Sequence, residues 1–262
     1  MSDISQQLVD RVLSARDKGE KLSIRGGASK LFLGREAEGE PLSLAEHSGI
    51  VSYHPVELVM TVRAGTRLVE IESTLHEQGQ MLSFEPPTFA GEASIGGTFA
   101  CNLSGPARPW SGSVRDMVLG IKLINGRGEH LKFGGQVMKN VAGYDVARTQ
   151  AGAMGSLGIM TEISLKVMPI PAATLTLVQE MDAPQAIETM NRLAATPKPL
   201  TAACWQDNKL YLRLSGAKSA VEGTAKQWQG DVIEQGHGFW QSLNEQRSDF
   251  FRGDAPLWRF SV

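Results

Sequence analysis

Clustered glycine is the feature that most constrains how this chain can fold. The sequence of 262 residues contains 28 glycines, and they gather directly after residues 21–25, within 91–105 and within 134–158. Because glycine has no Cβ, such segments permit tight turns and close approach of the backbone to a ligand or to another segment. The clusters stop after Pro171. We therefore place a boundary near Pro169–Pro171 and predict two domains, residues 1–169 and 170–262.

The first domain is predicted to mix helices and strands. A helix with an apolar stripe is expected to start near Ile4 and to end at Gly19, and a second helix is expected to be capped by Thr66 and to stop at Gly79. The turn at 125–128 predicts a hairpin. Strands are expected at 21–25, 59–63, 81–84, 114–124, 129–133 and 159–168.

The second domain is predicted to be a ferredoxin-like unit. Its strands are expected at 175–181, 200–205, 210–214 and 231–234, and its helices at 184–195 and 217–228. The order β-α-β-β-α-β defines this unit. The ending, residues 256–262, has the pattern of a strand in progress, so we expect this lobe to be incomplete; an ordinary C-terminal strand is the alternative.

Composition excludes several classes of protein. The formal charge is −2, which gives no basic excess for a nucleic-acid partner. No apolar run approaches the roughly 20 residues of a membrane span, and residues 1–7 lack a signal peptide. The two cysteines, Cys101 and Cys204, form no CxxC motif, and the five histidines form no ligand pattern. We therefore expect a cytoplasmic protein without a metal site.

Three glycine-rich segments are candidates for binding a phosphate-bearing cofactor. The first is Arg25-Gly26-Gly27-Ala28-Ser29, whose backbone N–H groups and hydroxyl could converge on an anion. It matches neither a P-loop nor the GxGxxG fingerprint, and a purely structural turn is the alternative. The second is Ser94-Ile95-Gly96-Gly97-Thr98 with Asn102 and Gly105, where a helix N-terminus would favour phosphate. The third is the run Gly152, Gly155, Gly158 before Ile159.

Other candidates keep two interpretations. The aromatic residues Phe89, Phe99 and Trp110 could line a ring system or belong to the core. Tyr144 could reach a ligand or anchor a loop, and His237 is expected in a surface loop. The sequence identifies no catalytic base.

Taken together, residues 21–169 resemble the PCMH-type FAD-binding domain, also called the vanillyl-alcohol-oxidase type. The segments that carry the resemblance keep the family's order and spacing; they are 25–30, Pro86-Pro87, 94–97, 102–105, 115–120 and 155–159. More narrowly, residues 133–145 and 250–259 resemble the smaller FAD-binding subunit of bacterial glycolate oxidases. The resemblance extends along essentially the whole chain, although family members run further at the C-terminus.

The resemblance implies an α+β fold with a two-subdomain FAD-binding domain and a cap lobe. It implies that FAD contacts Arg25, Gly26, Gly27, Ala28, Ser29, Pro87, Ser94, Ile95, Gly96, Gly97, Asn102, Gly105, Gly158 and Ile159. Some members attach flavin through a His or Cys in the first loop; since 25–30 contains neither, we expect non-covalent FAD.

The activity implied is oxidation of glycolate, a small 2-hydroxy acid, to glyoxylate. The implied partners are the larger FAD subunit of glycolate oxidase and an iron–sulfur subunit, in a complex that is cytoplasmic or peripheral on the inner face of the cytoplasmic membrane. The alternatives are a non-catalytic assembly subunit and a stand-alone flavin-dependent hydroxy-acid dehydrogenase.

Overall fold

The computed structural model describes residues 2–136 and 143–258, and its contacts divide the chain into two units. The first unit consists of Met1–Ser104 and Gly112–Ile170, and the second of Gly105–Ser111 and Pro171–Val262. The short segment Gly105–Ser111, which includes helix α4 (Arg108–Ser111), therefore belongs with the second unit and not with the residues that flank it in sequence.

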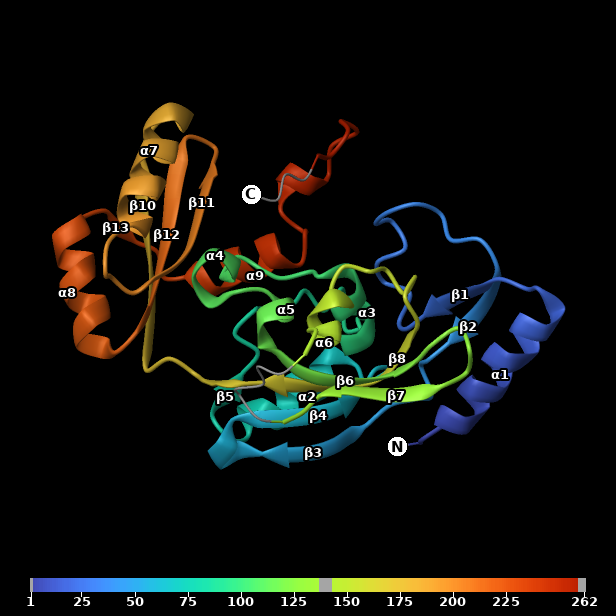
Figure 1. The fold of residues 1–262 in the computed structure, drawn as a ribbon. Coiled ribbons are helices and arrows are strands. Elements are labelled where there is room, and N and C mark those ends of the chain that lie inside the picture. Colours follow the sequence, from blue (N-terminus) through green and yellow to red (C-terminus); the bar gives the residue numbers. More distant parts are fainter. Residues whose placement is uncertain (1, 137–142, 259–262) are drawn as a thin grey trace. The chain divides into compact units, whose positions relative to one another are not determined.

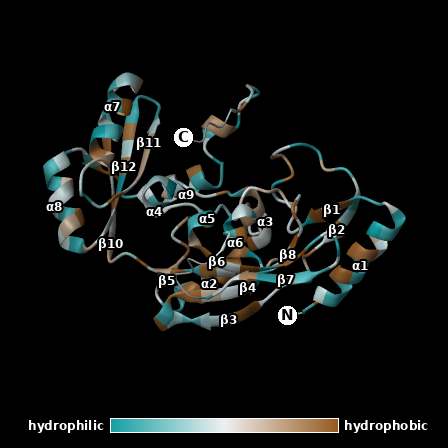
Figure 2. Cartoon of the chain, viewed as in Figure 1, coloured by the Kyte–Doolittle hydropathy of each residue, from teal (hydrophilic) through white to brown (hydrophobic). Residues whose placement is uncertain are grey.

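A five-stranded antiparallel sheet forms the centre of the first unit (Figure 1). Its strand order is β3 (Ile50–His54), β4 (Val59–Arg63), β8 (Ile159–Lys166), β6 (Val118–Ile124) and β7 (His130–Gly134). Helices α3 (Ile95–Cys101), α5 (Val114–Met117) and α6 (Val146–Thr149) lie along one face of this sheet, and α2 (Leu68–His76) buries its apolar stripe in the same core. Apolar residues gather on the central strands and on the helix faces (Figure 2).

The segment that leads into the first glycine turn is held by a small parallel sheet. Helix α1 (Ser5–Lys18) ends at Gly19, which has φ of 68° as helix terminators commonly do. Strand β1 (Leu22–Arg25) then pairs in parallel with β2 (Glu40–Ser43). A second short sheet of this unit pairs β5 (Gln80–Met81) with β9 (Met168–Pro169) in antiparallel orientation. The pairing with β2 therefore fixes the direction in which β1 leads into Gly26.

The second unit is the predicted β-α-β-β-α-β arrangement, which confirms this part of the α+β fold. It runs β10 (Ala173–Glu180), α7 (Ala183–Ala194), β11 (Leu200–Gln206), β12 (Lys209–Gly216), α8 (Lys218–Trp228) and β13 (Asp231–Val232). The antiparallel sheet has the order β11-β12-β10-β13. Helix α9 (Gly236–Asn244) follows and is anchored by the indole Nε1–H of Trp240, which donates to the Thr176 hydroxyl at 3.0 Å. A 3-10 turn, η2 (Asp249–Phe251), comes near the end of the described chain.

Two predicted elements of the first unit are present but begin at other residues than expected, for local reasons. The expected strand 114–124 begins only at Val118, because Val114–Met117 form helix α5. The Asp116 carboxylate accepts from the backbone N–H of Ser113 at 2.8 Å, which starts that helix and lowers the Asp116 pKa. Thr66 is not the cap of α2, since its hydroxyl donates to the Arg63 carbonyl at 2.7 Å and the helix begins after Arg67.

Other differences concern element lengths and places. The strand expected at 81–84 is confined to Gln80–Met81, and His237 lies exposed in helix α9 instead of in a loop. Strands β2 and β3 and the 3-10 turn η1 (Pro55–Glu57) were not expected. Residues 137–142, part of the segment compared with glycolate oxidase subunits, and residues 259–262, the end of the expected C-terminal strand, lie outside the described residues.

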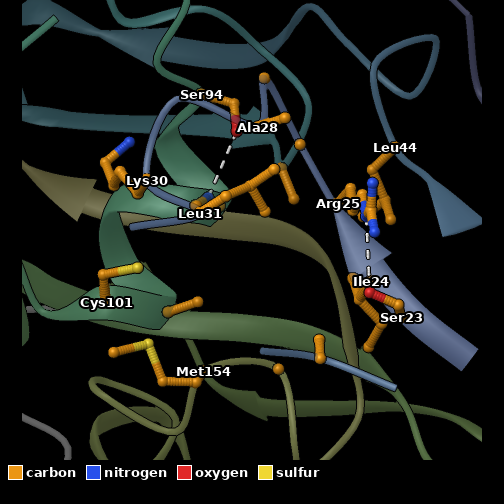
Figure 3. A pocket seen from close by; sticks show the side chains of 18 of the residues that line it. Ser23, Ile24, Arg25, Ala28, Lys30, Leu31, Leu44, Ser94, Cys101 and Met154 are labelled. Carbon is orange, nitrogen blue, oxygen red and sulfur yellow. Dashed lines mark hydrogen bonds between the residues drawn. The ribbon is translucent and has the colours of Figure 1, made fainter. Parts of the chain in front are cut away.

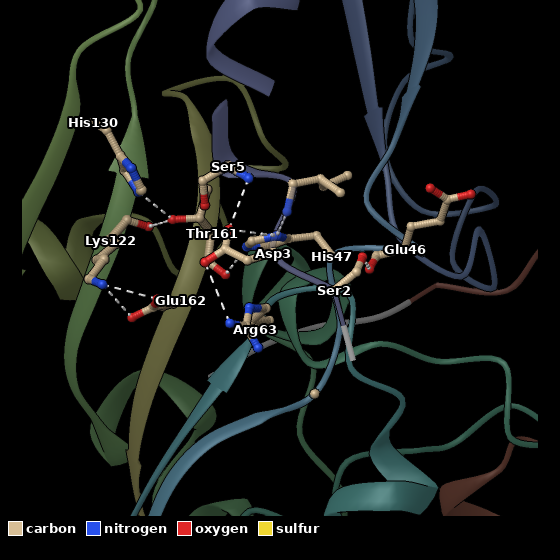
Figure 4. Close-up of polar contacts among 12 residues, drawn as sticks. Ser2, Asp3, Ser5, Glu46, His47, Arg63, Lys122, His130, Thr161 and Glu162 are labelled. Carbon is tan, nitrogen blue, oxygen red and sulfur yellow. Dashed lines mark hydrogen bonds and ion pairs between the residues drawn. The ribbon is translucent and has the colours of Figure 1, made fainter. Parts of the chain in front are cut away.

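A buried histidine fastens the N-terminal segment to the sheet (Figure 4). His47 is fully buried; its Nδ1 accepts from the backbone N–H of Ile4 at 3.2 Å, so its Nε2 carries the hydrogen and donates to the Thr161 carbonyl at 3.1 Å. Burial lowers the pKa of His47. Asp3 lies 3.8 Å from Nδ1, and hydrogen bonds from Ser5 lower the pKa of Asp3 to about 2.

Candidate functional site

The candidate site is an open cavity of about 170 Å³ within the first unit (Figure 3). Three segments supply most of its lining: strand β1 with the loop that follows it, helix α3 with the preceding Ser94, and the residues that lead into β8. Leu44, after β2, and Ala64, after β4, complete it. Of the residues predicted from sequence, the following line it: Arg25, Gly26, Gly27, Ala28, Ser29, Ser94, Gly96, Gly97 and Gly158. The structure thus brings all three predicted glycine segments to one cavity.

The remaining predicted residues are not among those that line the cavity. Ile95 and Ile159 are buried in the hydrophobic core, and Pro87 is buried as well. Asn102 ends helix α3 in the left-handed conformation, with φ of 49°, and its Oδ1 is buried without a hydrogen-bond partner in the described part of the chain. Gly105 belongs to the second unit.

The first glycine pair lets its loop lie directly against residues 92–94. A Cβ on Gly26 would overlap the Ser94 hydroxyl, and one on Gly27 would overlap the Glu92 carbonyl oxygen. Ala28 follows with φ of 54°, a conformation that costs an L-residue strain. Across residues 2–136 and 143–258, nothing accepts a hydrogen bond from the backbone N–H of Gly27, Ala28 or Ser29. These donors can serve a bound anion.

The start of helix α3 is already satisfied from within the protein. Ser94 is its N-cap, and the Ser94 Oγ accepts from the Gly97 N–H at 3.3 Å. The N–H groups of Ile95 and Gly96 donate to the carbonyls of Thr66 and Ala64 at 3.0 and 2.8 Å. The expectation of free N–H groups at this helix start is therefore wrong. Gly97 is less tightly enclosed than Gly26 and Gly27: a Cβ there would lie 3.3 Å from the Ser94 Oγ, which would have to shift only slightly.

The third glycine segment reaches the cavity through its last members. Gly158 has φ of 136°, and a Cβ on it would stand 2.7 Å from the Ile124 carbonyl oxygen, so close packing requires glycine there. Gly155 also lines the cavity, beside Ile24, whereas Gly152 faces Asn102. This segment therefore shapes the wall of the cavity beside strand β8.

Charge in the cavity is of one sign. The described lining contains Arg25, Lys30 and Arg35 and no Asp or Glu. Lys30 is 8% exposed; its Nζ donates to the Ser29 hydroxyl at 3.3 Å and stands 5.5 Å from the centre of the Phe89 ring. A half-buried thiol, Cys101, also lines the cavity, and burial raises its pKa while the charge of Lys30 opposes that shift.

Sequence reasoning missed several lining residues. Lys30 follows the glycine loop directly, and a cation at that place was a usable signal. The apolar residues Leu31, Leu33, Met154 and Met160 gave none, because in sequence they are indistinguishable from core residues. Of the aromatic candidates, Phe99 is core, Phe89 packs against Phe32 and beneath Lys30, and Trp110 packs in the core of the second unit. Tyr144 is 99% exposed.

The cavity fits a diphosphate-bearing ligand. Unused N–H donors, a buried ammonium and an acid-free lining are the features that bind phosphate oxygens. In the described ranges, no group of three or more His, Cys, Asp or Glu side chains could hold a metal ion. Every described helix is too short or too polar to cross a membrane.

Comparison with known proteins gives the same ligand class. Residues 4–134 match the family model for the FAD binding domain. The glycolate oxidase subunit GlcE of Escherichia coli (strain K12) is 47% identical over 99% of this chain and 74% of its own length. A D-2-hydroxyglutarate dehydrogenase of Xanthomonas citri pv. viticola is 33% identical over 61% of this chain, and the match spans about a third of that protein, 33% of its length.

The fold itself recurs in a solved structure of an alkyldihydroxyacetonephosphate synthase. That structure superimposes with a TM-score of 0.72 over 94% of this chain and 54% of its own, at 17% identity. At that identity the likeness establishes the fold alone. The family match and the extended similarity to GlcE establish more: this chain belongs to the family of the FAD binding domain and, within it, to the family of glycolate oxidase subunit GlcE.

Proposed function

We propose that this chain is the FAD-binding subunit of a complex that oxidises glycolate to glyoxylate and passes the electrons to an iron–sulfur subunit. The observation that carries the proposal is the similarity to a glycolate oxidase subunit over 99% of the chain, which includes both units. The cation-lined glycine cavity supports it, because an enzyme of this kind must hold a dinucleotide cofactor by its phosphates.

FAD, when bound, supplies the two-electron acceptor for the hydroxy acid. The role of this chain is to bind and orient the FAD. The N–H groups of Gly27, Ala28 and Ser29 would hold the phosphates, with the nearby cations balancing their charge. The apolar side chains of Leu31, Met154 and Met160, which line the cavity, would contact the bound cofactor.

The described lining lacks the side chains that most often remove a proton from a substrate; its thiol, Cys101, has a pKa raised by burial, and its Lys30 Nζ donates to the Ser29 hydroxyl. It includes no His, Asp, Glu or Tyr, and such a step needs a base within hydrogen-bond reach of the substrate. Two cysteines in the whole sequence are too few for an iron–sulfur cluster, which normally uses four. We therefore propose that the larger FAD subunit and an iron–sulfur subunit complete the reaction, in the cytoplasm or on the inner face of the membrane.

The test is glycolate-dependent reduction of a dye such as dichlorophenolindophenol. The flavin-loaded chain is measured alone and then after co-purification with its partner subunits, with flavin and iron quantified. We expect a useful rate per flavin only in the complex. Equal rates in both would favour a stand-alone dehydrogenase, and an active complex in which this chain carries no flavin would favour an assembly subunit.

A further inference from the structure

Lys30 occupies a particular place in the cavity. Figure 3 shows it on the side of Ser94 and Cys101, whereas Arg25 lies on the side of Ser23 and Leu44. Its Nζ is 3.3 Å from the Ser29 hydroxyl and 3.8 Å from the point where a Cβ on Gly97 would stand. The ammonium thus stands between the first glycine loop and the start of α3.

The burial of Lys30 separates it from the other cations of the cavity. Lys30 is 8% exposed, Arg25 is half-buried and Arg35 is exposed. A buried ammonium interacts with an anion far more strongly than an exposed one, because less water screens the pair. The Phe89 ring beneath Nζ adds a cation–π contact that holds the ammonium in place.

We propose that the Lys30 ammonium binds the diphosphate of the dinucleotide and, with the N–H groups of Gly27, Ala28 and Ser29, selects the charged dinucleotide over uncharged flavin. The inference rests on the proposed flavin-binding function. It assigns the selectivity to a side chain, beyond the backbone cradle that the glycines provide. The start of α3 cannot take this part, because its N–H groups are engaged within the protein.

The test is a titration of the flavin-free full chain with FAD, in which flavin fluorescence reports binding, at low and at high NaCl concentration. Wild type is compared with Lys30→Met, Lys30→Arg and a control, Lys132→Met, which removes the same charge from the exposed strand β7. We expect Lys30→Met to weaken FAD binding about tenfold or more and to reduce its salt dependence. Lys30→Arg should retain most of the affinity, and Lys132→Met should match wild type.

The outcomes distinguish the proposed role of Lys30 from the proposed flavin-binding function of the chain. If wild type binds FAD and Lys30→Met binds it equally well, or loses affinity with an unchanged salt dependence, Lys30 does not bind the diphosphate. If wild type binds no FAD, the proposed function fails first. Circular dichroism and thermal unfolding check that each variant folds. Lys30→Gln is measured if Lys30→Met does not fold, and failure of both to fold would make the role of Lys30 structural.

Discussion

The α-carbon of Gly27 lies against the carbonyl oxygen of Glu92 with no room for a side chain between them. This contact fixes the path of the first glycine loop along residues 92–94. Gly97, on the facing segment, is different: a Cβ there would be 3.3 Å from the Ser94 Oγ and 3.8 Å from the Lys30 Nζ. Gly27 is therefore needed for packing of the backbone, whereas Gly97 is less tightly enclosed, although in sequence each is the second residue of a Gly-Gly pair.

Substitution should separate folding from binding at these two positions. Gly27→Ala should destabilise the protein by about 1–3 kcal/mol or more, because the methyl group must displace backbone. Gly97→Ala should fold, at a smaller cost, and should weaken FAD binding, because its methyl group would stand 3.8 Å from the Lys30 Nζ, in space that we assign to the diphosphate. Urea unfolding and FAD titration of both variants measure the two effects. A stable Gly27→Ala protein, or a folded Gly97→Ala protein with wild-type FAD affinity, would contradict this assignment.

Ala28 carries a backbone strain that glycine would relieve. Its φ of 54° lies in the left-handed region, which costs an L-residue roughly 1 kcal/mol or more. Ala28→Gly should therefore raise the free energy of unfolding by about 0.5–1 kcal/mol, despite the greater freedom of glycine in the unfolded chain. Ala45→Gly is the control; Ala45 is exposed and has no positive φ, so glycine should lower stability there. Equal losses for both variants would show that Ala28 is unstrained.

The fold was more predictable than the cavity. The hairpin of β6 and β7 and the ferredoxin-like order carry strong signals, namely turn residues between apolar runs of the right lengths. Residues 114–117 were predicted as strand but form α5, because their strand propensity is outweighed by the Ser113–Asp116 hydrogen bond that starts this helix. Strand β2 is short and contains Pro41, so no alternation marks it.

The cavity was predictable only where its residues are unusual in sequence. Paired glycines mark the loop and the start of α3, but sequence does not say which glycines are needed for packing and which leave room. The helix start seemed open to phosphate because its partners, the carbonyls of Ala64 and Thr66, come from a distant part of the chain. Long-range backbone pairing of this kind leaves no local signal.

Stability should fall on acidification through the pH at which an unfolded histidine titrates. Burial lowers the pKa of His47 below 6.5, so at mildly acidic pH the unfolded chain binds a proton that the folded chain does not. The contribution of neutral His47 to the free energy of unfolding is thus present above about pH 6.5 and is lost at lower pH, with a slope of at most about 1.4 kcal/mol per pH unit. Asp3 does not alter this window, because its pKa is about 2 when folded and 3.8 when unfolded.

Urea unfolding between about pH 5 and pH 8 measures this effect. Wild type should lose stability toward pH 5, and His47→Gln, which cannot titrate, should show a shallower dependence even if it is less stable throughout. The Ile4 and Thr161 hydrogen bonds explain any uniform loss in that variant. A wild-type stability that stays level or rises on acidification would show that His47 is not held neutral.

Flavin should be released from this chain by acid precipitation. The first loop has no His or Cys, but the structure places one thiol, Cys101, in the described lining of the cavity. A thiol bonds covalently through its thiolate, and burial raises the pKa of Cys101, which disfavours that form. We therefore expect the yellow chromophore in the supernatant for wild type and Cys101→Ser alike. Cys204→Ser is the matched control, since Cys204 lies in the second unit and its pKa is raised to about 11. Flavin that stays in the wild-type and Cys204→Ser pellets but leaves the Cys101→Ser pellet would identify a covalent bond at Cys101.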